Sequence, residues 1–374
     1  MELPGQSSKQ VPEKRVCRIL VDSLADAGLT NAQMTNAREI VIRLDPERFQ
    51  VRMFHVDTPD ERIRKLPNLE LIRLPRRGQT LRIFREFAFG PHEILFYLKV
   101  APASRWYMEL RKAHRDQRVV IGSVESRADI RNEPTVPKAI ARMWEQTVLR
   151  CDYLFSNSQA VRHSLQREFG LASEVVPTGV DTKFFVPDRE RGAHARPRVL
   201  FVGSLRPFKQ PQMLLEAARR FPQADFVIVG DGEMAAELKA RKVQEKLDNV
   251  TLSGGLDAAA LRTEYQRADA FLFPSTWEGS PKVLLEAAAC GLPVIARRNY
   301  EPESVVDQTT GYLVGSDEEL FARLEELLGN AELRRKLGTA GRRHAEGFDW
   351  DLIAKKWEEV FLRVRWPEFA GKSF

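Results

Sequence analysis

Residues Phe273–Ala296 read FPSTWEGSPKVLLEAAACGLPVIA. A short apolar run leads into a loop that contains Gly279 and Pro281, an apolar helical stretch follows, and a Gly-Leu-Pro turn precedes a second apolar run. This order predicts a strand, a tight loop, a helix and a returning strand, the unit from which parallel sheets with helical covers are built. Two glutamates, Glu278 and Glu286, stand eight positions apart within it. The segment therefore predicts both an α/β fold and a ligand site at the start of a helix.

The residue types of this segment suit an anionic sugar-like ligand. Pro281 fits the first position of a helix, and Gly279 lets a ligand approach the backbone closely. The amides of residues 279–284 can face a phosphate. Glu278 in the loop can accept hydrogen bonds from sugar hydroxyls, and Glu286 can accept them from a ribose diol. The alternative is two solvated acids, but Glu286 stands in an almost wholly apolar helix, where a carboxylate needs a partner.

A second loop carries fixed positive charge. In FVGSLRPFKQPQMLL, residues 201–215, a predicted strand ends at Gly203, Arg206 and Lys209 follow, and a helix begins near Pro211. The N-terminus of a helix offers unpaired amides and the positive end of its dipole, so two cations beside it would suit a diphosphate. The alternative is an ordinary basic turn that touches only solvent.

The rest of the chain repeats the strand–helix rhythm. Strands are predicted at Val16–Asp22, Val51–Val56, Leu69–Leu74, Val119–Val124, Tyr153–Asn157, Glu174–Pro177, Val199–Gly203, Phe226–Gly230, Val250–Ser253, Ala270–Pro274 and Val294–Ala296. The polar, proline-flanked segment 187–197 separates two such series, which predicts two doubly wound domains with a cleft between them. The expected divisions are a loose tail at 1–15, a first domain at 16–187, a second at 188–350, and a terminal helix in 351–374 that packs back on the first domain.

Composition places limits on function. The 374 residues are 43% hydrophobic and 29% charged, which is typical of a soluble globular protein. Three distant cysteines predict neither a disulfide framework nor a zinc site, and the polar N-terminus lacks the apolar core of a secretory signal, so a cytoplasmic location is expected.

The net positive charge of the chain lies in its first half, where basic residues outnumber acidic ones. Arginines alternate with Leu, Ile and Phe in Arg73–Phe89, which could favour an anionic membrane surface, peripherally at the inner face. The alternative is an amphipathic helix whose apolar side simply packs inward. No nucleic-acid-binding module accompanies the charge, so nucleic acid is not an expected partner.

Taken together, the motifs resemble those of the retaining family 4 glycosyltransferases, which have the GT-B fold of two facing Rossmann-like domains with a central cleft. The resemblance rests on the Phe273–Ala296 segment, FVGSLRPFK at 201–209, VGDGE at 229–233, NSQAVRHSLQREFG at 157–170, VVPTGVDTKFFVP at 175–187, GYLV at 311–314 and FDWDLIAKKWEEV at 348–360. It covers most of residues 152–364, whereas the first 150 residues or so match mainly in their rhythm, as expected of a domain that binds a variable acceptor.

The resemblance implies a role for each matching position. Lys209 would bind the donor diphosphate, Glu286 the nucleotide ribose and Glu278 the transferred sugar, with backbone near 254–256 at the base. The implied catalytic residues are Arg206, Lys209 and Glu278. The implied donor-binding residues are Gly28, Gly203, Gly255, Leu256, Gly279, Ser280, Pro281, Lys282, Val283 and Glu286. Neither a metal nor a cofactor is expected.

Two positions depart from the family pattern. Ser204 stands where the family usually has the arginine of a Gly-Arg-Leu motif, and Arg206 is the candidate to replace that arginine. Glu125, after the predicted strand 119–124, stands where histidine or aspartate is common. It could meet the sugar or the acceptor, or cap the following turn. Asp349 and Asp351 form an acid-x-acid pattern like the metal-binding motif of other glycosyltransferases. Here the pattern opens the terminal helix, where the role of an aspartate as helix N-cap is sufficient to explain it.

The expected activity is transfer of a hexose-type sugar from a nucleotide diphosphate sugar to a hydroxyl of a glycan, lipid-linked or small-molecule acceptor, with retention and without metal. Bacterial cell-surface polysaccharide or glycolipid synthesis is the expected setting. The alternatives are a nucleotide-sugar epimerase or a phosphorylase on the same fold, or a non-catalytic binding member of a polysaccharide assembly, an idea motivated by the absent arginine at Ser204.

Overall fold

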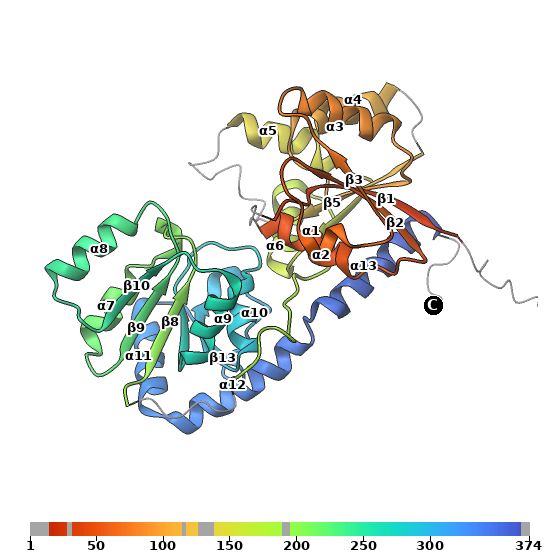
Figure 1. The fold of residues 1–374 in the computed structure, drawn as a ribbon. Helices are drawn as coiled ribbons and strands as arrows, with labels where there is room; N and C mark the ends of the chain where they lie inside the picture. The colour runs from red at the N-terminus through yellow and green to blue at the C-terminus, as the bar shows by residue number, and fades with distance from the viewer. Residues whose placement is uncertain (1–14, 28–31, 114–116, 126–137, 189–194, 368–374) are drawn as a thin grey trace, which may run out of the picture. The chain divides into compact units, whose positions relative to one another are not determined.

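The structure is a computed structural model that describes residues 15–27, 32–113, 117–125, 138–188 and 195–367. It divides into two compact units, which are described separately here (Figure 1). The first unit comprises Met1–Gly122, Arg142–Tyr153 and Trp357–Phe374, and the second comprises Ser123–Ala141 and Leu154–Lys356.

A seven-stranded parallel sheet in the order β3-β2-β1-β4-β5-β6-β7 is built from the first half of the chain. Its elements are β1 (Cys17–Leu24), α1 (Ala32–Ile42), β2 (Phe49–His55), α2 (Glu61–Arg64), β3 (Leu69–Arg73), α3 (Gln79–Phe89), β4 (Ile94–Phe96), α4 (Pro102–Ala113), β5 (Val119–Val124), α5 (Lys138–Gln146), β6 (Tyr153–Ser156), α6 (Gln159–Phe169) and β7 (Glu174–Val175). The order reverses between β1 and β4, as in a doubly wound fold.

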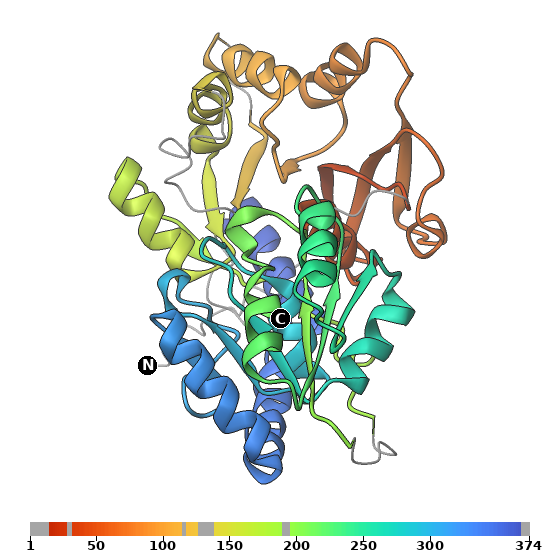
Figure 2. The ribbon, with the colours of Figure 1, turned by 90° about the vertical axis from the view of Figure 1, so that its left-hand side faces the viewer.

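A six-stranded parallel sheet in the order β10-β9-β8-β11-β12-β13 follows. Its elements are β8 (Arg198–Val202), α7 (Met213–Arg220), β9 (Asp225–Val229), α8 (Ala235–Gln244), β10 (Val250–Gly254), α9 (Ala258–Arg267), β11 (Ala270–Phe273), α10 (Lys282–Ala289), β12 (Val294–Arg297), β13 (Gly311–Val314), α11 (Asp317–Gly329), α12 (Ala331–Glu346) and α13 (Trp350–Arg365). Helices lie along both faces of this sheet, with α7 on one side and α9 and α10 on the other (Figure 1 and Figure 2).

The second sheet owes its stability to strands that are apolar on both faces. Val199, Leu200 and Phe201 in β8 are fully buried, as are Phe271 and Phe273 in β11. Continuous burial of this kind is typical of a parallel strand covered by helices on both sides. The sequence pattern predicts every strand of the two sheets except β4 in the first and β13 in the second. These strands are three and four residues long, and such short runs carry too little pattern to separate a strand from a loop.

The segment that precedes β8 packs with the second sheet rather than the first. Val180 and Phe185 belong to the second hydrophobic core, and Arg342 of α12 donates hydrogen bonds to the carbonyls of Thr182 and Phe185 at 3.0 and 2.8 Å. The predicted boundary at residue 187 therefore lies several residues after the chain has joined the second core.

The terminal helix α13 contributes to the first unit through its second half. Trp357 lies 4.7 Å from Phe96 of β4 between ring centroids, and Phe361 lies 4.9 Å from the same ring and 6.1 Å from Phe49 of β2. The Glu358 carboxylate accepts a hydrogen bond from the Asp45 amide at 2.7 Å. One face of the first sheet is thus covered by the last helix of the chain.

Candidate functional site

The strand order of the second sheet places the two predicted loops side by side. The order reverses between β8 and β11, and ligands of open parallel sheets bind at such a switch point, outside the carboxyl ends of the strands. The loop after β8 carries Arg206 and Lys209, and the loop after β11 carries Glu278. Hydrogen bonds join the loops directly, because the Thr276 amide and the Ser275 hydroxyl donate to the Phe208 carbonyl at 2.8 and 3.2 Å.

Lys209 and Glu278, predicted separately, form an ion pair. The Lys209 ammonium lies 2.5 Å from Glu278 Oε1, and the Ser275 hydroxyl donates to the same oxygen at 2.5 Å. Glu278 is buried, and the Lys209 ammonium also lies 5.1 Å from the centroid of the Phe273 ring. Pairing within this apolar setting holds both charges in fixed positions, since a buried charge needs a partner.

Arg206 stands apart from that pair. Its side chain is exposed, and its guanidinium has no hydrogen-bond or ion-pair partner among the residues that the structure describes. The neighbouring backbone is fixed, because the Gly203 and Leu205 amides donate to the Val229 and Asp231 carbonyls at 3.0 and 2.9 Å. Ser204 is exposed in the same loop. An exposed cation on a rigid loop is available to an anionic ligand.

Glycine allows the loop after β9 to lie against this backbone. Gly230 has a φ of 140°, and a Cβ there would come within 1.9 Å of the Gly203 carbonyl oxygen. Any other residue would push the two loops apart, so the VGDGE motif serves packing at this edge. Beyond it, the Asp231 carboxylate accepts a hydrogen bond from the Gly255 amide at 2.8 Å, which fixes the predicted base-binding backbone. Gly255 is exposed and Leu256 is half-buried.

The helix α10 begins one residue later than predicted. Pro281 is its N-cap, with φ −72° and ψ 110°, and Lys282 is the first helical residue. Gly279, Ser280, Lys282 and Val283 are all half-buried around this helix start.

Glu286 has the partner that its apolar helix demands. The Tyr265 hydroxyl of α9 donates to Glu286 Oε2 at 2.9 Å. Burial raises the pKa of the Glu286 carboxyl, while the Tyr265 hydrogen bond and the Lys282 charge lower it. Burial, together with the carboxylate, also raises the pKa of the Tyr265 hydroxyl well above its usual range. The other carboxylate oxygen and the raised proton affinity leave Glu286 able to accept or share a hydrogen bond with a diol.

Arg297 was missed by the sequence analysis and contacts both loops. It ends β12 and is 7% exposed, and its guanidinium donates to the Pro274 carbonyl and to Gln210 Oε1, each at 3.4 Å. It also pairs with Asp317 at the start of α11. An arginine at the carboxyl end of a buried strand was the available signal, since such a charge needs neighbouring acceptors.

Two site residues were predicted in the first 150 residues of the chain, Gly28 and Glu125. Gly28 lies outside the described residues. Glu125 is half-buried at the end of β5, and its carbonyl accepts a hydrogen bond from the Asn157 amide at 3.3 Å. A buried pair that was not predicted lies at the β1–β4 switch point, where the Asp22 carboxylate accepts from the Lys99 amide at 2.8 Å. Burial raises the pKa of Asp22 and lowers the pKa of Lys99.

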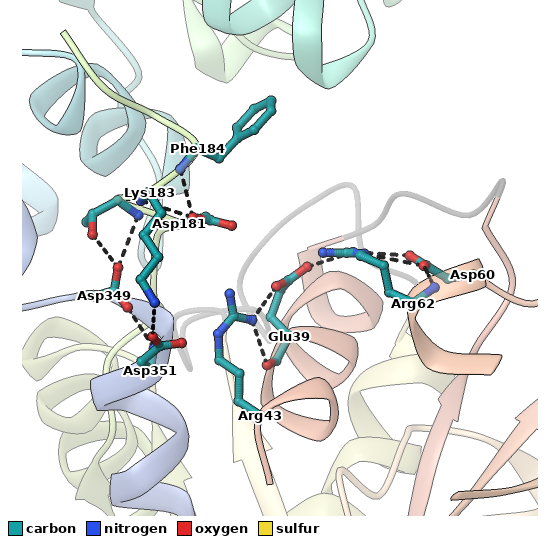
Figure 3. A network of polar contacts seen from close by, with 10 residues as sticks. Glu39, Arg43, Asp60, Arg62, Asp181, Lys183, Phe184, Asp349 and Asp351 are labelled. Carbon is teal, nitrogen blue, oxygen red and sulfur yellow. Dashed lines mark hydrogen bonds and ion pairs between the residues drawn. The ribbon is translucent and has the colours of Figure 1, made fainter. Parts of the chain in front are cut away.

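The acid-x-acid pattern of the terminal helix is engaged in local contacts (Figure 3). The Asp349 carboxylate accepts hydrogen bonds from Thr182 and from the Asp351 amide, and the Asp351 carboxylate pairs with Lys183 at 2.6 Å. Within the described part of the chain, no group of three or more His, Cys, Asp or Glu side chains is arranged to hold a metal ion.

The Arg73–Phe89 segment runs from the last residue of β3 through a loop to the end of α3. Phe87 and Glu86 are buried, and Glu86 pairs with Arg52 and Arg82 at 2.8 and 2.9 Å. At the same time Leu81 is 64% exposed and Phe89 is 73% exposed, so the apolar residues do not all pack inward. No helix in the described residues combines the length and the apolar character needed to cross a bilayer.

Comparison with known proteins finds similarity in sequence and in fold. Residues 186–344 match the family model described as "Glycosyl transferases group 1". The chain is 32% identical over 246 residues to a D-inositol 3-phosphate glycosyltransferase of Segniliparus rotundus, covering 59% of this chain and 55% of that protein. It is 33% identical over 219 residues to a GDP-mannose-dependent alpha-(1-6)-phosphatidylinositol monomannoside mannosyltransferase of Mycolicibacterium smegmatis, covering 52% of this chain and 57% of that protein. The chain thus spans little more than half the length of these relatives.

Solved structures show the same fold at low identity. The sucrose-phosphate synthase of Thermosynechococcus elongatus superposes with a TM-score of 0.77 at 20% identity, covering 94% of this chain and 99% of that one. HepE of Anabaena in complex with UDP and glucose superposes with a TM-score of 0.72 at 16% identity, covering 92% and 99%. The fold is GT-B, and residues 186–344 are similar in sequence to the glycosyl transferases group 1 family.

Proposed function

We propose that this protein is a glycosyltransferase that moves a hexose-type sugar from a nucleotide diphosphate sugar to an acceptor hydroxyl. The observation that carries the proposal is the Lys209–Glu278 ion pair at the β8–β11 switch point, with the exposed Arg206 on the same loop. The similarity of residues 186–344 to glycosyl transferases group 1 and the Glu286–Tyr265 pair support it.

In the proposed reaction the bond between sugar C1 and the β-phosphate oxygen breaks while a bond forms from C1 to the acceptor oxygen. The acceptor's proton passes to the departing phosphate on the same face of the sugar, which gives retention. Arg206 and Lys209 stabilise the negative charge that grows on the phosphate, and such stabilisation acts mainly on the transition state. Glu278 positions the sugar hydroxyls, and Glu286 holds the ribose. These charges make a metal ion unnecessary in the proposed mechanism.

The activities for which the relatives are named guide the choice of substrates. One is GDP-mannose-dependent and others act on D-inositol 3-phosphate, while a structural neighbour binds UDP and glucose. UDP, GDP and ADP sugars are therefore screened first by thermal shift, because a ligand of the folded state raises apparent stability by about 2.7 kcal/mol at one hundred times its Kd. Inositol phosphates and lipid-linked glycans are the first acceptors to test.

The activity test compares Lys209→Ala and Glu286→Ala with the wild type in sugar transfer to an acceptor. Loss of one charge-stabilising donor is expected to lower kcat by about 10²–10³-fold. Lys239→Ala is the matched control, because Lys239 is an exposed lysine on α8 without an ion-pair partner among the described residues. Unchanged rates in both site variants would overturn the proposal. Free sugar released without acceptor, or a requirement for inorganic phosphate, would indicate an epimerase or a phosphorylase instead.

The proposal extends to a peripheral site of action at the inner face of a membrane. The exposed Leu81 and Phe89 of α3 lie in the same segment as the exposed Arg76, Arg77 and Arg85. Apolar side chains flanked by arginines suit an anionic bilayer surface. Flotation with vesicles that contain phosphatidylglycerol should carry the wild type to the lipid fraction, and Leu81→Ser should reduce that fraction. Protein that stays with the soluble fraction regardless of lipid charge would remove this part of the proposal.

A further inference from the structure

A basic cavity lies at the amino ends of the central strands of the first unit. Its volume is about 680 Å³, and its lining includes Arg18, Arg111, Arg118 and Arg365. Glu93 is the only acidic side chain among the described residues that line it. A cavity of this size matches the usual range for small-ligand sites. Four guanidinium groups facing one carboxylate favour an anionic occupant.

The backbone of the sheet builds the cavity. Arg18 is the second residue of β1, and Glu93 and Arg118 immediately precede β4 and β5. The Glu93 amide donates to the Arg18 carbonyl at 2.8 Å, and the Val119 amide donates to the Glu93 carbonyl at 2.9 Å. These ladder hydrogen bonds fix the spacing of the three side chains. The backbone at Arg18, Glu93 and Arg118 is therefore held by the sheet, and the turn between α3 and β4 supplies further lining residues.

The four arginines differ in the contacts that they make within the protein. Arg118 donates to the Gly90 carbonyl at 3.1 Å, and Arg111 pairs with Asp152 at 2.9 Å, so both help to fix the helix ends. Arg18 and Arg365 instead share the single Glu93 carboxylate, at 3.7 and 2.6 Å. Their side chains are 52% and 37% exposed. One carboxylate between two arginines leaves excess positive charge accessible from solvent.

An apolar wall accompanies the charge. Phe89, which is 73% exposed, lines the cavity together with Ala88 and Leu110. An exposed aromatic ring beside guanidinium groups suits a ligand that has both a phosphate and an apolar or aromatic part, because the ring stacks while arginine binds phosphate bidentately.

We infer that this cavity binds a phosphate-bearing ligand through Arg18 and Arg365, with Phe89 contacting the ligand's apolar part. The site lies at the opposite end of the first sheet from the carboxyl ends of its strands. The six residues of β5 alone separate the two ends by about 20 Å. It is therefore separate from the ligand site expected at the switch point of that sheet. The phosphate could belong to a soluble nucleotide or to a phospholipid headgroup.

Calorimetric titration with inorganic pyrophosphate tests the site. Arg18→Ala and Arg365→Ala should each weaken binding about ten-fold or more, since charge-assisted hydrogen bonds to phosphate are among the strong ones. Arg64→Ala is the matched control, because Arg64 is an exposed arginine on α2 without a partner among the described residues, and it should leave binding unchanged. Thermal midpoints show that each variant is folded.

The same titration in Lys209→Ala separates this site from the proposed donor site. Binding that survives Lys209→Ala but is lost in Arg18→Ala supports the cavity. Binding that is unaffected by Arg18→Ala and Arg365→Ala, or absent from the wild type, overturns it. If activity fails in the test above but this pattern holds, only the proposed function is lost.

Two further arms identify the source of the phosphate. A nucleotide source predicts that ADP binds Lys209→Ala more tightly than pyrophosphate and that Phe89→Ala removes the difference. A lipid source predicts that phosphatidic acid vesicles bind the protein, that pyrophosphate displaces it, and that Arg18→Ala abolishes the displacement. Failure of both patterns would overturn the assignment of an apolar contact to Phe89.

Discussion

At the scale of single residues, the site depends on charges that are held in place by specific neighbours. Lys209 and Glu278 form an ion pair, and the Ser275 hydroxyl donates a hydrogen bond to the same carboxylate. The Arg297 guanidinium holds both loops by donating hydrogen bonds to Pro274 and Gln210. A donor phosphate arriving beside Lys209 would compete with Glu278 for the ammonium. In the proposed function, binding would therefore free the Glu278 carboxylate for sugar hydroxyls and would couple recognition of the two halves of the donor.

Glu286→Gln tests how the ionisation of the Glu286 carboxyl contributes to the free energy of unfolding. Because burial raises the Glu286 pKa above that of a free carboxyl, the folded protein holds this proton to higher pH than the unfolded chain does. Its contribution to the free energy of unfolding is therefore most favourable below the unfolded pKa and is lost as pH rises through the folded pKa. We expect Glu286→Gln, which can keep the Tyr265 hydrogen bond, to gain stability relative to the wild type as the pH rises from about 4, near the usual glutamate pKa, through the folded pKa. The gain is about 1.4 kcal/mol for each unit that separates the two pKa values.

Urea unfolding midpoints of both proteins at several pH values in that range measure the difference. A constant difference between variant and wild type at every pH would contradict the raised pKa.

At the scale of elements, close approach between α12 and the turn after α10 fixes the helix that carries Glu286. A Cβ at Gly338 in α12 would lie 1.9 Å from the Gly291 carbonyl oxygen, and Gly291 itself has a φ of 79°. Two glycines from distant parts of the sequence thus let helix and turn pack backbone to backbone. Such contacts have little tolerance, because protein interiors are close-packed.

Gly338→Ala should lower the free energy of unfolding by about 1–3 kcal/mol, since the added methyl forces α12 away from the turn. Gly329→Ala is the matched control. Gly329 ends α11, and nothing lies within 4 Å of the Cβ it would gain. There alanine should be neutral or stabilise by about 0.5–1 kcal/mol, because it restricts the unfolded chain. Chemical denaturation measures both, and equal effects at the two positions would contradict the packing.

At the scale of the whole molecule, α13 contributes to both compact units. Its residues up to Lys356 are grouped with the second unit, and those from Trp357 onward with the first. Trp357 is 3% exposed and its ring lies against Phe96 and Phe361, whereas Leu352 on the same helix is 45% exposed.

Trp357→Ala should destabilise the first unit by about 3–5 kcal/mol through loss of buried aromatic area, and Leu352→Ala should cost much less. Limited proteolysis with mass spectrometry would locate the effect, because fragments from residues 15–113 should appear earlier in Trp357→Ala. Equal protease resistance in the two variants would contradict the packing of α13 on the first sheet.

Local patterns in the sequence are enough to predict the α/β class and eleven of the thirteen strands among the described residues, because parallel strands buried on both faces leave runs of β-branched and aromatic residues. They also predict that Glu286 needs a partner, since an acid in an apolar helix is costly alone. Long-range packing, in contrast, makes Tyr265 that partner, brings Lys209 to Glu278, and lets Arg297 connect their loops. Those contacts join residues 21 to 87 positions apart, and the contacts of Lys209 with Glu278 and of Arg297 with Gln210 cross the β8–β11 switch point. The strand order that creates them depends on packing of the whole sheet rather than on any local pattern.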